Sequence, residues 1–162
     1  QKGHKSIKVV NSGLSGETSS GLKARIDWVL QTLPNITILS IGANDAMRGL
    51  PTDLMEQNIA EIIEKLQANG SNVILGGMQI YDNLGKKYVT DFNAIYTRLA
   101  AKYDLPLIPF LLAGVAGDAN LNQADGIHPT TEGYALIVEN NIMPKLAPLL
   151  ADILNTTQTE KQ

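Results

Sequence analysis

The stretch Ile36-Thr-Ile-Leu-Ser-Ile-Gly-Ala-Asn-Asp45 decides the fold class of this chain. Its first six residues are mostly apolar or β-branched, and the run has the length of a buried strand. Gly42 closes the run, and the polar residues Asn44 and Asp45 follow it. If this strand belongs to a parallel α/β sheet, Asn44 and Asp45 lie where sites form in such sheets, in the loops at the carboxyl ends of the strands.

Strand and helix patterns alternate on both sides of this stretch. Strands are predicted at residues 6–10, 72–75 and 105–109, the last at an edge of the sheet because its prolines cannot donate to a ladder. Helices with one apolar face are predicted at residues 22–30, 55–66, 92–103 and 131–154, with Pro144 expected to break or kink the last one. The apolar stripes are interpreted as core packing. The alternation predicts a parallel sheet with helices on both faces.

Length and composition indicate one globular domain. The chain has 162 residues, of which 44% are hydrophobic and 18% charged, which is enough to enclose a core. A net charge of −3 does not favour binding to nucleic acid or to an anionic membrane surface. The absence of cysteine excludes disulfides, thiolate zinc sites and a cysteine nucleophile. No apolar run is long enough to span a bilayer. Residues 1–154 are expected to form the domain, and residues 155–162 a flexible tail.

The segment Asp125-Gly-Ile-His-Pro129 has the composition of an acid–base site. A neutral imidazole acts as a general base when a carboxylate accepts its Nδ1 hydrogen and fixes its tautomer. Asp125 and His128 are three residues apart, and Gly126 allows the tight turn that brings them together. The alternative is a surface histidine beside a turn aspartate, which an isolated Asp-x-x-His pair would favour.

Two further loops contain candidate hydrogen-bond donors. The Asn44 amide can donate to a developing oxyanion, or Asn44 can simply occupy a left-handed turn or cap the next segment. Asp45 is expected to orient that loop. Gly16 allows a backbone N–H to approach a ligand closely, or it is an ordinary turn glycine before a helix capped by Thr18 or Ser19.

Together these loops resemble the SGNH (GDSL-type) hydrolases, most closely the bacterial arylesterase and multifunctional thioesterase/lysophospholipase branch. The segments that carry the resemblance are Val9-Val-Asn-Ser-Gly-Leu-Ser-Gly-Glu-Thr-Ser19, Ile41-Gly-Ala-Asn-Asp45, Met78-Gln-Ile80 and Asp125-Gly-Ile-His-Pro129. The resemblance implies a flavodoxin-like, three-layer α/β sandwich. It also implies a periplasmic or secreted enzyme, although a cytoplasmic one remains an alternative.

The same resemblance implies a role for each candidate. His128 is the general base and acid and Asp125 is its partner, while Gly16 and Asn44 supply the oxyanion hole. Residues 46–50 correspond to a mobile loop at the acyl pocket, and residues 80–87 to the leaving-group side. The expected substrate-binding residues are Met47, Leu50 and Ile80. No metal and no cofactor are expected.

The nucleophile of this family is the serine of a Gly-Asp-Ser-Leu motif at the end of its first, central strand. This chain contains no Gly-Asp-Ser. Among the nearby serines (Ser12, Ser15, Ser19, Ser20 and Ser40), Ser15 is not in a nucleophile elbow and Ser40 is expected to be structural in a buried strand. The central strand is therefore expected to be missing from the 162 residues, with the serine on an unseen segment or a short N-terminal peptide. An intact mass above 17.5 kDa, or a copurifying peptide, would support this expectation.

The expected activity is hydrolysis of small carboxylic esters or thioesters through an acyl-enzyme. One alternative is a carbohydrate acetylesterase on the same scaffold. Another is a non-catalytic binding module, for which the missing serine is the argument. A nucleotide binder is disfavoured because no Gly-x-Gly-x-x-Gly or P-loop motif follows a strand.

Overall fold

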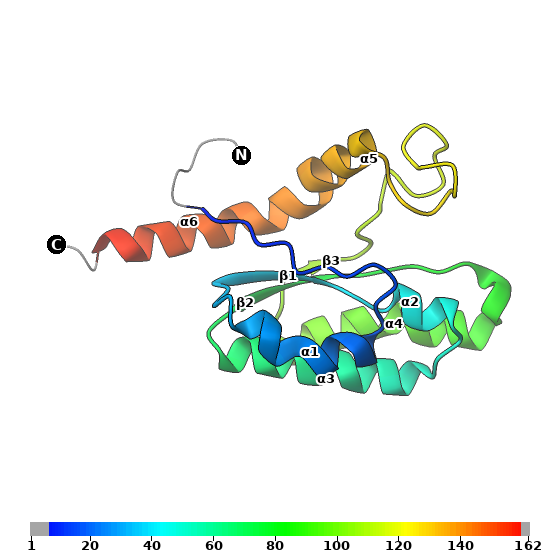
Figure 1. Ribbon diagram of the computed structural model, residues 1–162, viewed down its shortest axis with the longest axis horizontal. Helices are drawn as coiled ribbons and strands as arrows, with labels where there is room; N and C mark the ends of the chain where they lie inside the picture. Colours follow the sequence, from blue (N-terminus) through cyan, green and yellow to red (C-terminus); the bar gives the residue numbers. More distant parts are fainter. Residues whose placement is uncertain (1–6, 160–162) are drawn as a thin grey trace.

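The computed structural model describes residues 7–159 (Figure 1). The elements follow in the order α1 (Ser19–Leu30), β1 (Ile36–Ser40), α2 (Ala43–Met47), α3 (Thr52–Ala68), β2 (Asn72–Gly76), the 3₁₀ turn η1 (Asp82–Leu84), α4 (Lys86–Tyr103), β3 (Leu107–Ile108), α5 (Thr131–Leu136), the π-helix η2 (Ile137–Ile142) and α6 (Met143–Thr159). Strands and helices alternate as far as β3, which confirms the predicted α/β class.

The described sheet has three parallel strands in the order β1-β2-β3. Ile36 of β1 pairs with Asn72 of β2, and the register continues to Ser40 and Gly76. The short strand β3 lies at an edge, as predicted, because the prolines on either side of it cannot donate to a further strand.

Helices α1, α3 and α4 lie on one face of the sheet and enclose the main core (Figure 1). Helix α3 contributes a fully buried stripe, because its apolar residues recur at helical spacing: Met55, Ile59, Ile62, Ile63 and Leu66. Helix α6 lies on the opposite face and contacts β2. Three layers result, and this confirms the expected sandwich.

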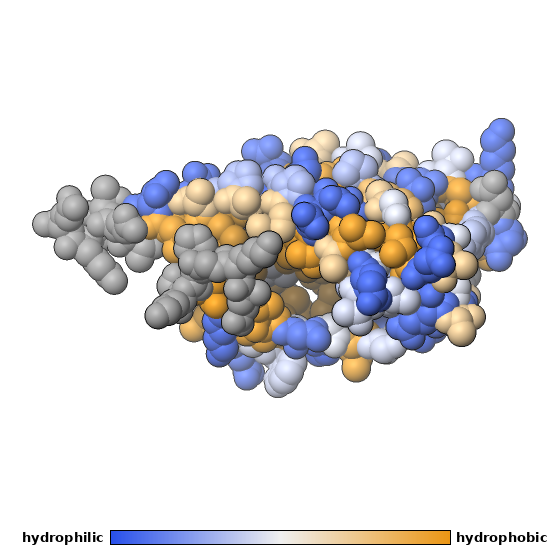
Figure 2. All heavy atoms as spheres, turned by 90° about the horizontal axis from the view of Figure 1, so that it is seen from above, coloured by the Kyte–Doolittle hydropathy of each residue, from blue (hydrophilic) through white to orange (hydrophobic). Residues whose placement is uncertain are grey.

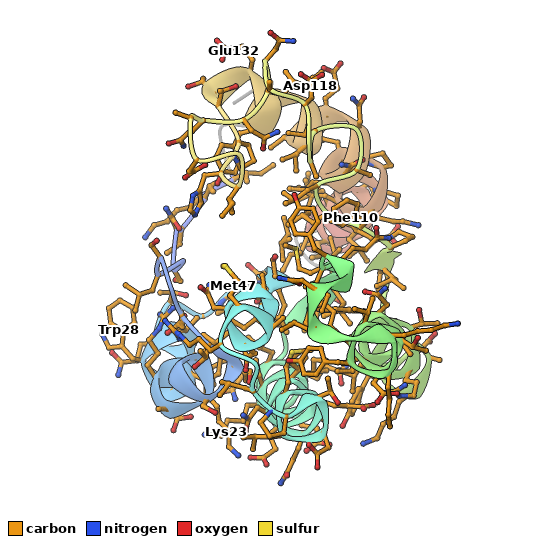
Figure 3. The ribbon with its side chains drawn as sticks, turned by 90° about the vertical axis from the view of Figure 1, so that its right-hand side faces the viewer. Lys23, Trp28, Met47, Phe110, Asp118 and Glu132 are labelled. Atoms are coloured by element: carbon orange, nitrogen blue, oxygen red, sulfur yellow. The ribbon has the colours of Figure 1, made fainter. Side chains whose placement is uncertain are left out.

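The second face of the sheet is covered unevenly. Ile74 of β2 is completely buried, whereas its register partner Ile38 in β1 is 38% exposed. Figure 2 shows a hollow on this side, and Figure 3 shows the same space between the sheet, the N-terminal segment (residues 7–18) and the α5–α6 layer. We call this space the central hollow. It lies beside β1, where no described strand pairs.

The strand predicted at residues 6–10 is not present. Residues 7–10 have no regular structure, Val9 is 78% exposed, and residue 6 lies outside the described residues. The segment runs along the central hollow, apart from β1, so its backbone groups find no neighbouring strand (Figure 3). A strand exists only where a ladder partner exists, and a β-branched sequence alone does not provide one.

The last helical region is continuous but changes its hydrogen-bond pattern. Helix α5 passes into η2, where the Met143 N–H donates to the Val138 carbonyl five residues earlier, and α6 follows. Pro144 therefore stands directly after a π-helical turn instead of breaking the helix. Helix α6 extends to Thr159, so residues 155–159 are helical where a tail was expected. Residues 160–162 lie outside the described residues, and the flexibility of this tail stays a prediction.

Candidate functional site

The loop after β1 is shaped by a glycine that no other residue can replace without strain. Gly42 has φ +114°, and a Cβ there would lie 2.5 Å from the Tyr96 hydroxyl. That hydroxyl is fixed, since it donates to the Ile41 carbonyl at 2.8 Å inside the core. Burial, together with the charge of Asp45, raises the pKa of Tyr96 far above its usual value, so it remains a neutral donor.

Helix α2 begins at once after Gly42 and carries Asn44. The Asn44 side chain is half-buried, and its amide makes no hydrogen bond with the described part of the chain. The positive φ belongs to Gly42, and α2 has no side-chain cap. The alternative roles of Asn44, as a left-handed turn residue or a cap, are therefore not what the structure shows. Its donor is available to a ligand.

Asp45 links this loop to the start of α1. Its carboxylate is 1% exposed and accepts from the Ser19 N–H at 2.8 Å and the Ser19 hydroxyl at 2.5 Å. Asn58 of α3 donates in turn to the Ser19 hydroxyl at 3.2 Å. The carboxylate thus lies at the N-terminus of α1, where the helix dipole favours negative charge. This geometry supports the expected orienting role of Asp45.

Gly16 lies in a turn held from several directions. The Glu17 N–H donates to the Leu14 carbonyl at 3.2 Å, and Gly16, at φ +76°, occupies the third position of the turn. The Gly16 N–H makes no hydrogen bond among the described residues. The ordinary role predicted for the loop is also present, because Thr18 caps α1 by accepting from the Gly21 N–H at 3.3 Å.

Two contacts fix the turn in place. Arg25 holds the Glu17 carboxylate through a two-point contact at 2.5 Å and donates to the Ser12 carbonyl at 2.7 Å. Arg48, directly after α2, donates to the Gly16 carbonyl at 2.8 Å. The loops of Gly16 and Asn44 are therefore joined. No sequence motif indicates the role of Arg48; its only signal is its position inside the expected acyl-pocket loop at residues 46–50.

Asp125 and His128 form the pair that their spacing predicted. Asp125 Oδ2 lies 2.7 Å from His128 Nδ1, and Oδ1 accepts from the backbone N–H groups of Ile127 and His128 at 2.9 and 3.0 Å. Gly126, at φ +69°, makes the tight turn between them. The hydrogen bonds from the His128 ring and the two N–H groups lower the pKa of Asp125 to about 2. The imidazole therefore faces an ionised carboxylate on one side, while its Nε2 is left for other chemistry.

The two halves of the candidate site lie on opposite sides of the central hollow. In Figure 3 the loop between Asp118 and Glu132, which includes Asp125 and His128, forms one border, and Met47 at the end of α2 lies at the other. No hydrogen bond or ion pair within residues 7–159 joins the pair to Gly16 or Asn44.

The three expected substrate-binding residues have different surroundings. Met47 is 60% exposed. Leu50 is half-buried, and its carbonyl accepts from the Tyr88 hydroxyl at 2.6 Å. Ile80 is half-buried and packs against the core. Only Met47 therefore offers a large free apolar surface.

Neither Ser15 nor Ser40 is placed as a nucleophile. Ser15 is exposed in the turn before Gly16. Ser40, expected in a buried strand, is exposed at the end of β1 with its hydroxyl 4.0 Å from the Met78 sulfur. That expectation was wrong because the central hollow leaves this part of β1 uncovered. No contact within the described residues joins Ser40 to His128.

Comparison with known proteins is consistent across sequence and structure. The model of the GDSL-like Lipase/Acylhydrolase family matches residues 2–136. Esterase TesA of Pseudomonas aeruginosa is 38% identical over 88% of this chain and 71% of its own length. The arylesterase of Vibrio mimicus is 32% identical over 82% and 67%. Thioesterase 1/protease 1/lysophospholipase L1 of Escherichia coli K12 is 33% identical over 81% and 64%. The crystal structure of TesA matches with a TM-score of 0.81, covering 88% of this chain and 79% of that one.

Proposed function

Because the chain belongs to the GDSL-like lipase/acylhydrolase family, a family of ester hydrolases, we propose that it contributes the base and the oxyanion hole to an acyl-transfer site. The substrates proposed are small carboxylic esters or thioesters, in keeping with relatives that are named esterase, arylesterase and thioesterase. The observation that carries this proposal is the Nδ1–Oδ2 contact of 2.7 Å between His128 and Asp125. It fixes the tautomer in which Nε2 can accept a proton.

The proposed reaction proceeds in two steps. A serine hydroxyl attacks the acyl carbonyl, its proton passes to His128 Nε2, and the Gly16 N–H and Asn44 amide donate to the oxyanion. The tetrahedral intermediate collapses, and His128 returns the proton to the departing alcohol or thiol. A water molecule, deprotonated by His128, then releases the carboxylic acid and the free serine. Both oxyanion donors are unpaired among the described residues, as this role requires.

We further propose that the serine is supplied by a segment outside these 162 residues. The support is the sequence, which contains no Gly-Asp-Ser, together with the central hollow beside β1. Ile38 faces this space with 38% of its surface exposed, although its partner Ile74 is fully buried. An apolar segment entering there would cover Ile38 and bring a nucleophile between Gly16 and His128.

The test compares the chain alone with the chain preceded by a segment that carries Gly-Asp-Ser-Leu. A fluorophosphonate probe is expected to label the second protein and not the first, because only an activated serine reacts. Labelling of the 162-residue chain itself would refute the external nucleophile. An extended protein that takes no label and hydrolyses no ester would instead favour a binding module.

The roles of the paired residues are tested in the extended protein. His128→Ala is expected to abolish hydrolysis of p-nitrophenyl esters while the circular dichroism spectrum is unchanged, and His4→Ala is the matched control. Near-normal turnover in His128→Ala would refute the assignment.

Hydrolysis rates on short and medium acyl esters, compared with the rate on acetylated xylan, separate acyl hydrolysis from sugar deacetylation. The exposed Met47 favours acyl chains.

The family resemblance also favours a periplasmic or secreted enzyme, which cell fractionation tests. No helix within residues 7–159 is long and apolar enough to cross a membrane.

A further inference from the structure

Asn122 is a buried polar residue that the proposed reaction does not use. Its side chain is 6% exposed and lies in the loop that leads to Asp125. The amide nitrogen donates to the carbonyls of Val115 and Asp118, at 2.7 and 2.8 Å. Because both partners are acceptors only, the nitrogen and not the oxygen has to face them, and the side chain has one orientation. The amide oxygen has no hydrogen-bond partner in the described part of the chain.

The main chain at Asn122 is paired directly with the catalytic segment. Asn122 and Pro129 form an antiparallel bridge. On either side of the bridge, the Gln123 N–H donates to the His128 carbonyl at 2.7 Å and the Thr130 N–H to the Leu121 carbonyl at 2.8 Å. The backbone position of His128 is therefore set by the position of residues 121–123.

The segment that Asn122 holds is itself anchored. Val115 is 1% exposed, and the preceding residues are tied to η2, where the Asn141 amide donates to the carbonyls of Leu111 and Ala113 at 2.9 and 3.0 Å. A chain of hydrogen bonds thus runs from η2 through residues 111–118 to Asn122, and from there to the hairpin of residues 121–130.

This anchoring matters because the pair has little packing of its own. The side chains of His128 and Asp125 are 57% and 45% exposed. Neighbouring side chains therefore do not lock their rotamers, and the hydrogen-bonded frame has to do so. A general base has to lie within hydrogen-bond reach of the proton that it accepts, so a small displacement of the hairpin reduces turnover.

We propose that Asn122 is a positioning residue for the Asp125–His128 pair, which it holds by tying their hairpin to the turn at residues 112–118, where Val115 is buried. Asn122 touches no reacting atom. Its effect on turnover rests on the proposed function, whereas its effect on the geometry of the pair does not.

The experiment measures the His128 Nδ1–H resonance and the Asp125 pKa by NMR. Asn122→Asp turns the two donations into oxygen–oxygen contacts, and Asn122→Ala removes them without repulsion. Asn140→Asp is the matched control, since Asn140 is an exposed asparagine of η2 and receives the same charge. In both Asn122 variants we expect the downfield His128 Nδ1–H resonance to broaden or disappear, and the pKa of Asp125 to rise from about 2 toward its ordinary range. In Asn140→Asp we expect neither change.

An unaltered Nδ1–H resonance and an unaltered Asp125 pKa in Asn122→Ala would overturn the proposal. Loss of cooperative unfolding in both Asn122 variants would also overturn it, because Asn122 would then serve folding in general. In the serine-extended protein, Asn122→Ala is expected to lower kcat by about 10²-fold with KM unchanged. If the parent protein is inactive but the NMR changes occur, the positioning role stands and the proposed function fails.

Discussion

The substitution Gly42→Ala tests how the loop that carries Asn44 is built. An added Cβ would lie 2.5 Å from the Tyr96 hydroxyl and 2.9 Å from the Met55 sulfur, closer than real Cβ contacts occur. The Met55 side chain can move, but the Tyr96 hydroxyl is 2.8 Å from the Ile41 carbonyl and buried. Alanine at φ +114° is strained in addition.

The magnitude follows from these two effects. Backbone strain costs about 1–3 kcal/mol and overpacking a further ~1–3 kcal/mol. The free energy of unfolding is therefore expected to fall by about 2–6 kcal/mol, which for a chain of this size lowers Tm by roughly 5–20 °C. Gly49→Ala is the matched control: its φ is +61° and no atom lies within 4 Å of the added Cβ, so only strain remains, about 1 kcal/mol.

Urea unfolding followed by circular dichroism measures the effect, and a double-mutant cycle identifies its origin. Tyr96→Phe removes the hydroxyl that the new Cβ would strike. The Gly42→Ala/Tyr96→Phe protein is therefore expected to be more stable than the sum of the single changes by about 1 kcal/mol or more. Additivity within about 0.5 kcal/mol would show that the clash with Tyr96 does not determine the requirement for glycine.

Three further outcomes are expected. Asn44→Ala in the serine-extended protein lowers kcat by about 10²–10³-fold through the loss of one oxyanion donor, and a variant with more than half of the parent kcat would exclude that role. Ser19→Ala removes a donor from the buried Asp45 carboxylate and lowers the free energy of unfolding by about 1–3 kcal/mol. Ser15→Ala, at an exposed position, is the comparison, and equal losses in urea titrations would contradict the argument. The pKa of Asp125 is depressed from 3.8 to about 2. The stability that this carboxylate contributes is therefore present above about pH 4 and is lost as the pH falls toward 2. A midpoint near pH 4 in a ¹³C titration of the Asp125 carboxyl would refute the depressed pKa.

The two longer strands are predicted correctly because the signals that bound them are local. β1 and β2 were placed to within one residue, because their apolar runs are bounded by glycine or by polar residues. The Asp125–His128 pair was predicted because its partners are three residues apart, so that a single turn can bring them into contact.

The failures concern features that depend on distant parts of the chain. Residues 7–10 have a strand-like sequence but no neighbouring strand, and Ser40 has a buried-strand context but an uncovered face. The contact of Arg48 with Gly16 joins residues that are 32 positions apart, and no local pattern encodes it.

The unpaired edge of β1 has a consequence for handling the protein in isolation. The strand Ile36-Thr-Ile-Leu-Ser40 is uncharged and contains no proline, and on the side away from β2 it pairs with no strand of the described residues. Short segments of this kind are templates for edge-to-edge pairing between molecules, which charged residues or bulges normally block. Concentrated solutions of these 162 residues are therefore expected to self-associate through β1, and a charged residue in place of Ile38 is the substitution that would keep them dispersed.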